Sequence, residues 1–515
     1  MIPYKNEPFS SFSEQEEQAS FLRALSTVRT QCGRNYPLWI GGKTEYPETG
    51  WIESFNPAEP EARIGNVAKG TAEHAHRAVE AASEAYPKWK STKVIERIRI
   101  LWKAAELLRR RKHEFSSWLV LETGKTWAEA DGETAEAIDF LNYYAHEAER
   151  LAACRPLTVY AGEDNEWKYE ALGVGIIIAP WNFPLAILAG MAVAALVCGN
   201  TVVVKPSSLT PVVAAKWIEL MHEAGLPPEV LQFVPGPGAE VGDALVDHPK
   251  TRFVSFTGSR EVGQRIYSRA SMVNLGQKWL KRSILELGGK DAIIVDADAN
   301  IEAAVQAIVV SSFGFSGQKC SACSRAIVHQ DVYHDVLHGV IAQTKRLRAG
   351  NPADFGVQIG TVIDGIAQRN LLRYIEEGKN EADIAYSGDI LDANGYYVPP
   401  TIFNEVPLEG MLAQQELFGP ILSFHRVEHF EAAIAAANDT VYGLTGAVFS
   451  RNRNHLAYAR EHFHVGNLYF NRKCTGALVG VHPFGGFGLS GTDSKAGGPD
   501  YLLNFLQGKV ISEAF

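Results

Sequence analysis

The chain has 515 residues, of which 46% are hydrophobic, and its formal net charge is −10. This length predicts about two to four domains. The acidic balance argues against a general nucleic-acid binder. The longest apolar run, residues 185–198, is shorter than the ~20 residues that cross a bilayer. We therefore expect neither nucleic acid nor a membrane as a partner.

The cysteines indicate a reducing compartment. Six are spread irregularly over the chain, at Cys32, Cys154, Cys198, Cys320, Cys323 and Cys474. A disulfide scaffold normally has a higher density of cysteines in a shorter chain. The N-terminus also lacks the basic and then apolar pattern of a secretory signal. We expect reduced thiols and a cytoplasmic location.

Helices are predicted over residues 71–150. Apolar side chains recur at helical spacing in 75–86 and again in 94–108. The second of these helices ends in the basic run 109–113. We interpret this run as a solvated helix end, where cations complement the helix dipole, rather than as an anion site.

Two alternating blocks follow. In the first, strands 175–179, 201–205, 231–234 and 252–256 are separated by helical segments. In the second, strands are predicted at 292–295, 326–329, 421–427, 444–449 and 465–470. Strands that alternate with helices indicate parallel sheets covered on both faces. The expected fold is α/β, with two Rossmann-like, doubly wound domains.

The domain boundaries are expected where this pattern is interrupted. The first domain would comprise residues 1–154 and 171–282, and the second residues 283–484. The extended polar stretch 155–170 and the glycine-rich tail 485–515 have no obvious place in either core. We expect them to form a small β arm and tail that mediate contacts in a homo-oligomer built from dimers.

The segment FSGQKCSAC, residues 315–323, holds a cysteine among small polar residues. A nucleophilic cysteine needs an open approach and a stabilised thiolate, and Lys319 is a candidate for lowering the thiol pKa. Cys320 and Cys323 also form a C-x-x-C pair, which allows a redox disulfide or half of a zinc site. From these residues alone, a catalytic thiol, a redox pair and inert core cysteines all stay open.

Two further segments carry polar side chains in apolar surroundings. Glu286 lies between leucines in LELGGK, and desolvation there would raise its pKa into the range of a general base. Its alternative is a solvated carboxylate in a turn. Asn182, in PWNFP, follows the first strand and is able to donate its amide N–H to an oxyanion. Its alternative is an ordinary helix N-cap.

Glycine turns at strand ends indicate a phosphate-bearing ligand. Thr257-Gly258-Ser259 closes one strand and opens a helix, an arrangement suited to a pyrophosphate. The usual G-x-G-x-x-G is absent, and residues 236–242 only approximate it. Dinucleotide binding is thus weakly indicated by spacing.

Together these segments resemble the aldehyde dehydrogenase superfamily from about residue 35 to the end. Eight segments occur in family order: PWNFP (180–184), VVKP (203–206), FTGS (256–259), ELGGK (286–290), GQKC (317–320), ELFGP (416–420), YGLTG (442–446) and PFGG (483–486). Any one of them could arise by chance, but all eight in order could hardly do so.

The resemblance implies a catalytic role for three residues. Cys320 would be the nucleophile that attacks an aldehyde carbonyl and passes through a thiohemiacetal to a thioester. Asn182 and the Cys320 backbone N–H would form the oxyanion hole. Glu286 would activate the water that hydrolyses the thioester. No metal is implied.

The resemblance also implies a nicotinamide cofactor, NAD. Its cleft would include Trp181, Lys205, Gly258, Ser259, Glu416 and Phe418. Many members carry a glutamate three positions after the lysine, where this chain has Ser208. Because a carboxylate there would repel a 2′-phosphate, its absence leaves NADP as an alternative. Gln415 replaces the first glutamate of the usual E-E-x-F-G-P.

Longer segments narrow the resemblance to the branch of the superfamily that oxidises L-glutamate γ-semialdehyde, formed from 1-pyrroline-5-carboxylate, to L-glutamate in proline catabolism. They are FSGQKCSACSR (315–325), HVGNLYFNRKCTGALVG (464–480) and GTDSKAGGPDYL (491–502), with AEAIDF (135–140) and NEPFSSFS near the N-terminus. We expect the form without a fused proline dehydrogenase, for which 515 residues leave no room.

This branch implies the substrate contacts. Ser321 and the backbone N–H groups of Gly476 and Ala477 would hold the α-carboxylate, since small residues let the backbone approach an anion. Phe183 and Phe484 would enclose the aliphatic stem, and Glu136 would line the entry. The alternatives are another semialdehyde, a CoA-acylating relative, a thiol–disulfide protein using the C-x-x-C pair, and a non-catalytic relative.

Overall fold

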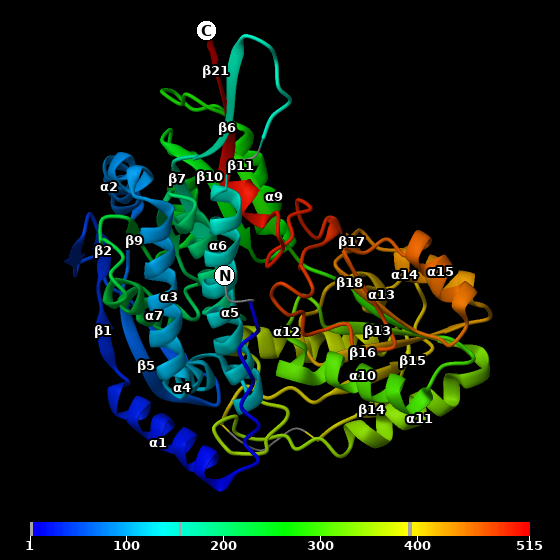
Figure 1. Cartoon of the computed structure of the whole chain (residues 1–515). Helices are drawn as coiled ribbons and strands as arrows, with labels where there is room; N and C mark the ends of the chain where they lie inside the picture. Colours follow the sequence, from blue (N-terminus) through cyan, green and yellow to red (C-terminus); the bar gives the residue numbers. More distant parts are fainter. Residues whose placement is uncertain (1–3, 154–155, 390–393) are drawn as a thin grey trace.

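In the computed structural model, which describes residues 4–153, 156–389 and 394–515, two seven-stranded sheets organise the chain. The first sheet has the strand order β11-β10-β7-β8-β9-β2-β3, and the second β14-β15-β16-β13-β12-β18-β19. Figure 1 shows them in two lobes that lie side by side. The expected α/β fold with two doubly wound sheets is confirmed.

The first sheet has a parallel centre and an antiparallel edge. Its parallel strands are β7 (Val174–Ile178), β8 (Thr201–Lys205), β9 (Leu231–Phe233), β10 (Thr251–Thr257) and β11 (Arg282–Glu286). The edge is the hairpin of β2 (Leu38–Ile40) and β3 (Lys43–Glu45). The chain steps from β7 to β8 and β9 on one side, then to β10 and β11 on the other. Ligands of open α/β sheets bind at such a switch point, beyond the carboxyl ends of the strands.

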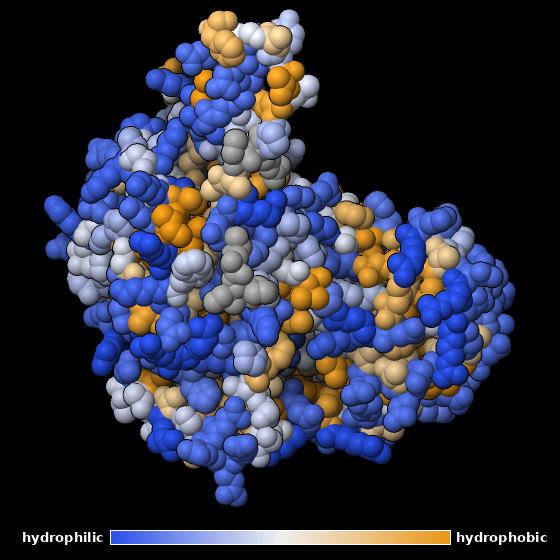
Figure 2. Space-filling view, viewed as in Figure 1, coloured by the Kyte–Doolittle hydropathy of each residue, from blue (hydrophilic) through white to orange (hydrophobic). Residues whose placement is uncertain are grey.

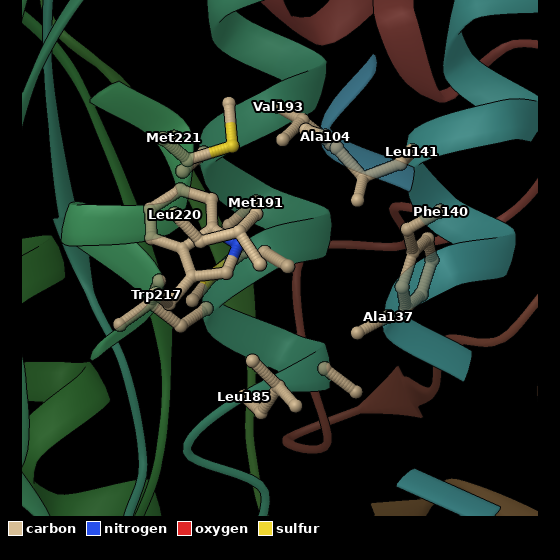
Figure 3. Packing of buried hydrophobic residues seen from close by; sticks show 14 of the residues in the cluster. Ala104, Ala137, Phe140, Leu141, Leu185, Met191, Val193, Trp217, Leu220 and Met221 are labelled. Carbon is tan, nitrogen blue, oxygen red and sulfur yellow. The ribbon is translucent and has the colours of Figure 1, made fainter. Parts of the chain in front are cut away.

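Helices pack on this sheet through apolar faces. They include α2 (Ala72–Ser91), α6 (Ala186–Val197), α7 (Pro211–Glu223) and α9 (Arg260–Ser271), and outside them α1 (Gln15–Gln31), α3 (Val94–Arg110), α4 (Lys112–Thr123) and α5 (Trp127–Ala152). In Figure 3, Met191 and Val193 of α6 lie between Trp217 of α7 and Phe140 of α5. Because α6 packs against helices on both sides, it lies at the centre of this core. Each fully buried side chain of this size stabilises the fold by about 1.5–3 kcal/mol.

The second sheet follows the same plan. Its parallel strands are β12 (Asp291–Val295), β13 (Cys323–His329), β15 (Thr401–Asn404), β16 (Ile421–Val427), β18 (Thr445–Phe449) and β19 (Asn467–Phe470), and β14 (Asp383–Ser387) joins antiparallel. Helices α10 (Ile301–Phe313) and α11 (Tyr333–Thr344) pack against it, as do α14 (Phe430–Asn438) and α15 (Arg453–His462).

The two sheets meet at a short junction. Strand β11 pairs with β10, with Thr257 opposite Glu286, so β11 belongs to the first sheet. The second sheet begins at Asp291. The change of sheet therefore falls within 287–290, a few residues beyond the expected division at 282/283. The expected division at 154/155 lies outside the described residues. The junction places the carboxyl end of the first sheet against the second lobe.

A two-stranded arm projects from the first lobe (Figure 1). It pairs β6 (Glu163–Ala171) with β21 (Leu506–Ala514) in antiparallel register, from Ala171 opposite Leu506 to Glu163 opposite Ala514. Figure 2 shows apolar groups at this end of the molecule on a mostly hydrophilic face. Among the exposed apolar side chains of the arm are Val159, Tyr160, Val510 and Phe515. Within the described residues, no helix is both long and apolar enough to cross a membrane.

Candidate active site

A cleft of about 1110 Å³ opens beyond the carboxyl ends of β7, β8 and β10. Its walls include Ile178, Lys205 and Phe256 from these strands. The second lobe contributes the segment 414–418 and Cys320. The cleft therefore lies between the lobes, at the switch point of the first sheet, and it reaches the predicted nucleophile.

The loop before Cys320 has an unusual backbone. Phe315 and Ser316 have φ angles of 51° and 53°, and Gly317 has 70°. Left-handed conformations cost about 1–2 kcal/mol in residues other than glycine, so surrounding bonds must hold them. A Cβ on Gly317 would lie 2.2 Å from the Gly419 carbonyl oxygen, so only glycine fits. The Gln318 amide bonds the Phe315 and Thr361 carbonyl oxygens and accepts the Ile363 N–H.

Cys320 is partly exposed, whereas Cys323 is buried. Desolvation raises the pKa of the Cys320 thiol well above its usual range, and the nearby carboxyl groups of Asp291, Glu416 and Glu286 raise it further. The thiol is therefore protonated at rest, and its attack on a carbonyl requires a proton acceptor. Glu286 is close enough for its charge to act on the thiol.

Lys319 does not favour the thiolate as its position next to Cys320 suggested. Its Nζ lies 2.6 Å from Glu129 Oε2, in an ion pair with α5. The pKa of Cys320 is raised rather than lowered, so this interpretation is wrong. The charge of Lys319 is engaged by Glu129, and the ion pair ties the nucleophile loop to the first lobe.

The Asn182 side chain points toward the nucleophile loop. Its Nδ2 donates to the Gln318 carbonyl oxygen at 3.0 Å, and the residue is 5% exposed. Helix α6 begins after Leu185, and the N–H groups at its start bond to the Glu133 carboxylate rather than to Asn182. The alternative of an N-cap asparagine is therefore not what this structure has. The Asn182 amide instead bonds to a residue two positions before Cys320, which places an N–H donor near the carbonyl that the thiol would attack.

Glu286 ends β11 and is buried. Its Oε1 accepts a hydrogen bond from Ser494 Oγ at 2.7 Å. Its Oε2 has no hydrogen-bonding side chain or backbone partner at bonding geometry among the described residues. Desolvation raises the pKa of Glu286 to about 8, against the opposing effects of the Ser494 bond and the Lys495 charge. The environment is that of a base poised near neutral pH, rather than of a solvated carboxylate.

The residues expected around a cofactor all line the cleft: Trp181, Lys205, Ser208, Gly258, Ser259, Glu416 and Phe418. Burial lowers the pKa of Lys205 to about 8, and its Nζ donates to the Pro206 carbonyl oxygen at 3.1 Å. Burial raises the pKa of Glu416 to about 7, although its Oε1 accepts the Gly289 N–H. Ser208 is exposed at the rim.

The expected substrate residues lie on four segments around Cys320. Ser321 is buried, and its carbonyl oxygen accepts from Cys474 Sγ at 3.5 Å, which joins it to the segment that carries Gly476 and Ala477. Gly476 has φ 72°, a conformation that favours glycine. These residues are not among those that line the cofactor cleft, so their grouping around one substrate stays a prediction.

The remaining predicted substrate residues flank the catalytic groups. Phe183 follows Asn182 directly, and its ring centroid lies 6.5 Å from that of Phe315. Phe484 forms an isolated antiparallel bridge with Ala496, two residues after Ser494, which bonds to Glu286. Glu136 projects from α5, where desolvation and the charge of Glu133 raise its pKa to about 8. All three are partly exposed.

Three features near the site were not predicted from sequence. Ser494 binds Glu286. Lys473 places its Nζ 3.1 Å from the point where a Cβ on Gly476 would lie. Lys125 Nζ donates a hydrogen bond to the Asn182 carbonyl oxygen. Of these, only Lys473 had a signal, as a cation two residues before the anchor segment TGA; the other two contacts join parts of the chain far apart in sequence.

The described cysteines Cys32, Cys198, Cys320, Cys323 and Cys474 are free thiols. In the described ranges, no group of three or more histidine, cysteine, aspartate or glutamate side chains is arranged to hold a metal ion. Cys323 instead points away from the cleft and bonds the Arg325 carbonyl oxygen at 3.5 Å. The two thiols of the C-x-x-C pair thus have different environments.

Comparisons with known proteins agree with this arrangement. The aldehyde dehydrogenase family matches residues 44–511. The 1-pyrroline-5-carboxylate dehydrogenase of Geobacillus kaustophilus is 54% identical over 513 residues, covering 100% of this chain and 99% of the relative. That of Bacillus subtilis is 53% identical over 514 residues, covering both chains fully. A crystal structure of 1-pyrroline-5-carboxylate dehydrogenase from Thermus with bound NAD has 50% identity and a TM-score of 0.98, covering 100% of each chain. The chain belongs to the aldehyde dehydrogenase family.

Proposed function

We propose that this chain oxidises L-glutamate γ-semialdehyde, the open form of 1-pyrroline-5-carboxylate, to L-glutamate with NAD, the second step of proline catabolism. The observation that carries the proposal is that Cys320 and Asn182 line one cleft, with the Glu286 carboxyl close enough to act on the Cys320 thiol. The similarity of the whole chain to 1-pyrroline-5-carboxylate dehydrogenases supports the choice of substrate.

The cleft fits a nicotinamide dinucleotide. Lys205 is buried and has one acceptor, the Pro206 carbonyl oxygen, so its ammonium has N–H groups left for ribose hydroxyls. Glu416 offers a carboxylate from the opposite lobe. The N-terminus of α9, which follows Gly258, supplies backbone N–H groups for a phosphate. NAD, when bound, supplies the hydride acceptor. The exposed Ser208 leaves NADP as an alternative.

The first half of the reaction occurs at Cys320. The sulfur attacks the aldehyde carbon, and its proton is accepted by Glu286 or by water. The developing oxyanion accepts N–H bonds from Asn182 Nδ2 and the Cys320 backbone, which is worth several kcal/mol in a water-poor site. Transfer of the aldehyde hydrogen with its electron pair to the cofactor then leaves a thioester on Cys320.

The second half uses Glu286. A water molecule attacks the thioester carbon as the Glu286 carboxylate accepts its proton, and the C–S bond breaks to release the acid. A pKa of about 8 leaves only a minor fraction of this carboxyl ionised at pH 7 but gives it a high affinity for the proton. The oxyanion hole serves this step too, because the same tetrahedral geometry recurs.

The substrate's polar end would bind away from the reacting carbon. We assign its α-carboxylate to the Ser321 hydroxyl and the N–H groups of Gly476 and Ala477. Phe183 and Phe484 would pack on the stem between the two ends. Glu136, which lies on the side of α5 toward Lys319 and Lys125, is placed at the entry. A simple alkyl aldehyde would leave the anion-binding backbone unsatisfied.

An NAD reduction assay tests the proposal. It compares L-glutamate γ-semialdehyde with succinic semialdehyde and a simple alkyl aldehyde, with and without CoA. We expect kcat/KM to be highest for the first substrate and CoA to have no effect. A clear preference for either other aldehyde would refute the substrate, and dependence on CoA would indicate an acylating enzyme.

The domain and assembly predictions belong to the same proposal. Residues 1–154 and 171–282 would bind the cofactor and 283–484 would carry the nucleophile, with β11 as the strand between them. The arm and tail, 155–170 and 485–515, would pair with a second copy in a homo-oligomer built from dimers, because the arm exposes apolar side chains. Light scattering of the intact protein and of one lacking 506–515 tests this assembly. We also propose a cytoplasmic location, in keeping with the free thiols, which cell fractionation tests.

A further inference from the structure

A buried ion pair lies directly beneath the turn that carries Asn182. Lys125, in the turn between α4 and α5, pairs with Glu133 on α5, and both side chains are fully buried. Removing one partner of such a pair is strongly destabilising, because the other charge is left unpaired in the interior. Both charged side chains also make hydrogen bonds outside the pair.

Those other bonds all go to the backbone of one turn. Lys125 Nζ donates to the Asn182 carbonyl oxygen. Glu133 Oε1 accepts the Leu185 N–H at 2.9 Å and the Ala186 N–H at 3.2 Å. The ion pair thus holds the turn on both sides of Phe183, and it supplies the acceptor that the uncapped start of α6 would otherwise lack.

The Lys125 cation also touches the nucleophile loop. Its Nζ lies 3.8 Å from the Phe183 ring centroid and 4.5 Å from that of Phe315. Phe315 is one of the left-handed residues that shape the approach to Cys320. A cation–π contact is stronger in a desolvated site than at an exposed one. One ammonium therefore joins the turn of Asn182 to the loop of Cys320.

We propose that Lys125 and Glu133 are positioning residues that fix the Asn182 amide against the Cys320 loop, so that its N–H meets the oxyanion of each tetrahedral intermediate. The inference rests on the proposed acyl chemistry at Cys320. Fixing the Asn182 carbonyl fixes its peptide plane, and with it the direction of the side chain whose Nδ2 now lies 3.0 Å from the Gln318 oxygen.

The test uses the double variant Lys125→Met/Glu133→Gln. It leaves no unpaired charge, and the glutamine oxygen still accepts the N–H groups at the start of α6. Two reactions of Cys320 are compared without cofactor. With p-nitrophenyl acetate, the sulfur attacks the ester carbon and the thiol proton passes to Glu286 or water. The oxyanion that forms then collapses to an acetyl-enzyme and releases p-nitrophenolate. Alkylation by iodoacetamide displaces iodide and forms no oxyanion.

We expect the acylation rate to fall about 100-fold, as for loss of one oxyanion-hole donor, while the alkylation rate stays within about twofold. In an Asn182→Ala background, the double variant should cause little further loss, since its effect acts through Asn182. Lys216→Met, which breaks the Lys216–Glu219 ion pair on α7, is the matched control and should leave both rates unchanged.

Three outcomes would overturn the positioning role: unchanged acylation, an equal fall of acylation and alkylation, or a full additional loss on top of Asn182→Ala. Lys125→Arg keeps a cation opposite Glu133 and should give an intermediate loss of acylation, which covers poor folding of the double variant. Absence of any burst that depends on Cys320 in the unmodified protein would instead refute the proposed function itself.

Discussion

Replacing Ser494 with alanine tests whether Glu286 is the base that activates water. The Ser494 hydroxyl donates to Glu286 Oε1 at 2.7 Å and favours the ionised carboxyl. Alanine removes this bond and adds no charge. We therefore expect the pKa of Glu286 to rise above its present value, and the hydrolysis of the thioester to slow at neutral pH while recovering at high pH.

The size of the effect follows from the bond. A hydrogen bond to a charged group contributes about 1.5–3 kcal/mol, and 1.36 kcal/mol corresponds to about one pH unit. From a pKa of about 8, the lower figure moves Glu286 to about 9. The ionised fraction at pH 7 then falls from ~9% to ~1%, whereas at pH 10 it stays above ~90%. Deacylation should be about tenfold slower at pH 7 and nearly unchanged at pH 10.

The assay follows p-nitrophenyl acetate turnover between pH 6 and pH 10. The burst reports acylation of Cys320, and the steady rate after it reports hydrolysis of the acyl-enzyme. Ser117→Ala is the matched control, because Ser117 is a buried serine that bonds only within α4. Glu286→Gln should remove the rising limb altogether.

The reasoning is refuted if Ser494→Ala leaves the rising limb where it is in the unmodified protein. It is equally refuted if Glu286→Gln retains that limb, because another group would then activate the water. A loss in Ser494→Ala that is the same at every pH would mean that the serine holds the fold rather than the pKa of Glu286.

Four further substitutions follow from the structure. Cys323→Ser should keep at least about half of the NAD-reducing activity, since its buried thiol points away from the cleft; loss of activity would favour a redox pair. Gly317→Ala should lower kcat at least about tenfold and destabilise the fold by about 1–3 kcal/mol, measured by urea unfolding, because the new Cβ meets the Gly419 oxygen; unchanged kcat would contradict the packing. Ser208→Glu should lower kcat/KM with NADP about tenfold relative to NAD, by repulsion of the 2′-phosphate; an unchanged ratio would place that phosphate elsewhere. Lys473→Met should raise the KM for L-glutamate γ-semialdehyde about threefold at low salt and less at 0.5 M NaCl, with no effect on an alkyl aldehyde; an equal effect on both aldehydes would exclude a role at the α-carboxylate.

The sequence predicted the parts of the fold in which pattern and burial agree. Strands such as β8 (TVVVK) are buried on both faces and read as apolar runs between helices. The arm strand β6 (EDNEWKYEA) has no such pattern, because its partner β21 lies more than 330 residues away and both strands are largely exposed. The arm was nevertheless expected, as an extended polar stretch. The hairpin of β4 (Trp51–Asn56) and β5 (Glu59–Ala68) was missed, because neither strand is fully buried and neither forms an apolar run.

The local sequence located the residues of the candidate site but could not determine the role of each one. For Asn182, an N-cap and an oxyanion donor are equally compatible with PWNFP, and only the position of Gln318 separates them. For Glu286, the raised pKa depends on burial by residues 485–494, which are some 200 positions away. Lys319 was expected to lower the pKa of the Cys320 thiol. The local sequence could not show that the lysine instead pairs with Glu129, which lies on the other lobe.

The four-residue junction between β11 and β12 separates the two halves of the chemistry. The base ends the last strand of one sheet, and the nucleophile precedes a strand of the other. The distance between Glu286, which would activate the water, and the thioester on Cys320 therefore depends on how the two lobes are oriented, and not on the conformation of a single loop. Lys205 and Glu416 line the cleft from opposite lobes, so a ligand that contacts both would hold the lobes in one orientation. Hydrolysis of the thioester, which forms only after hydride transfer, therefore depends on how the two lobes are oriented, with no rearrangement needed inside either sheet.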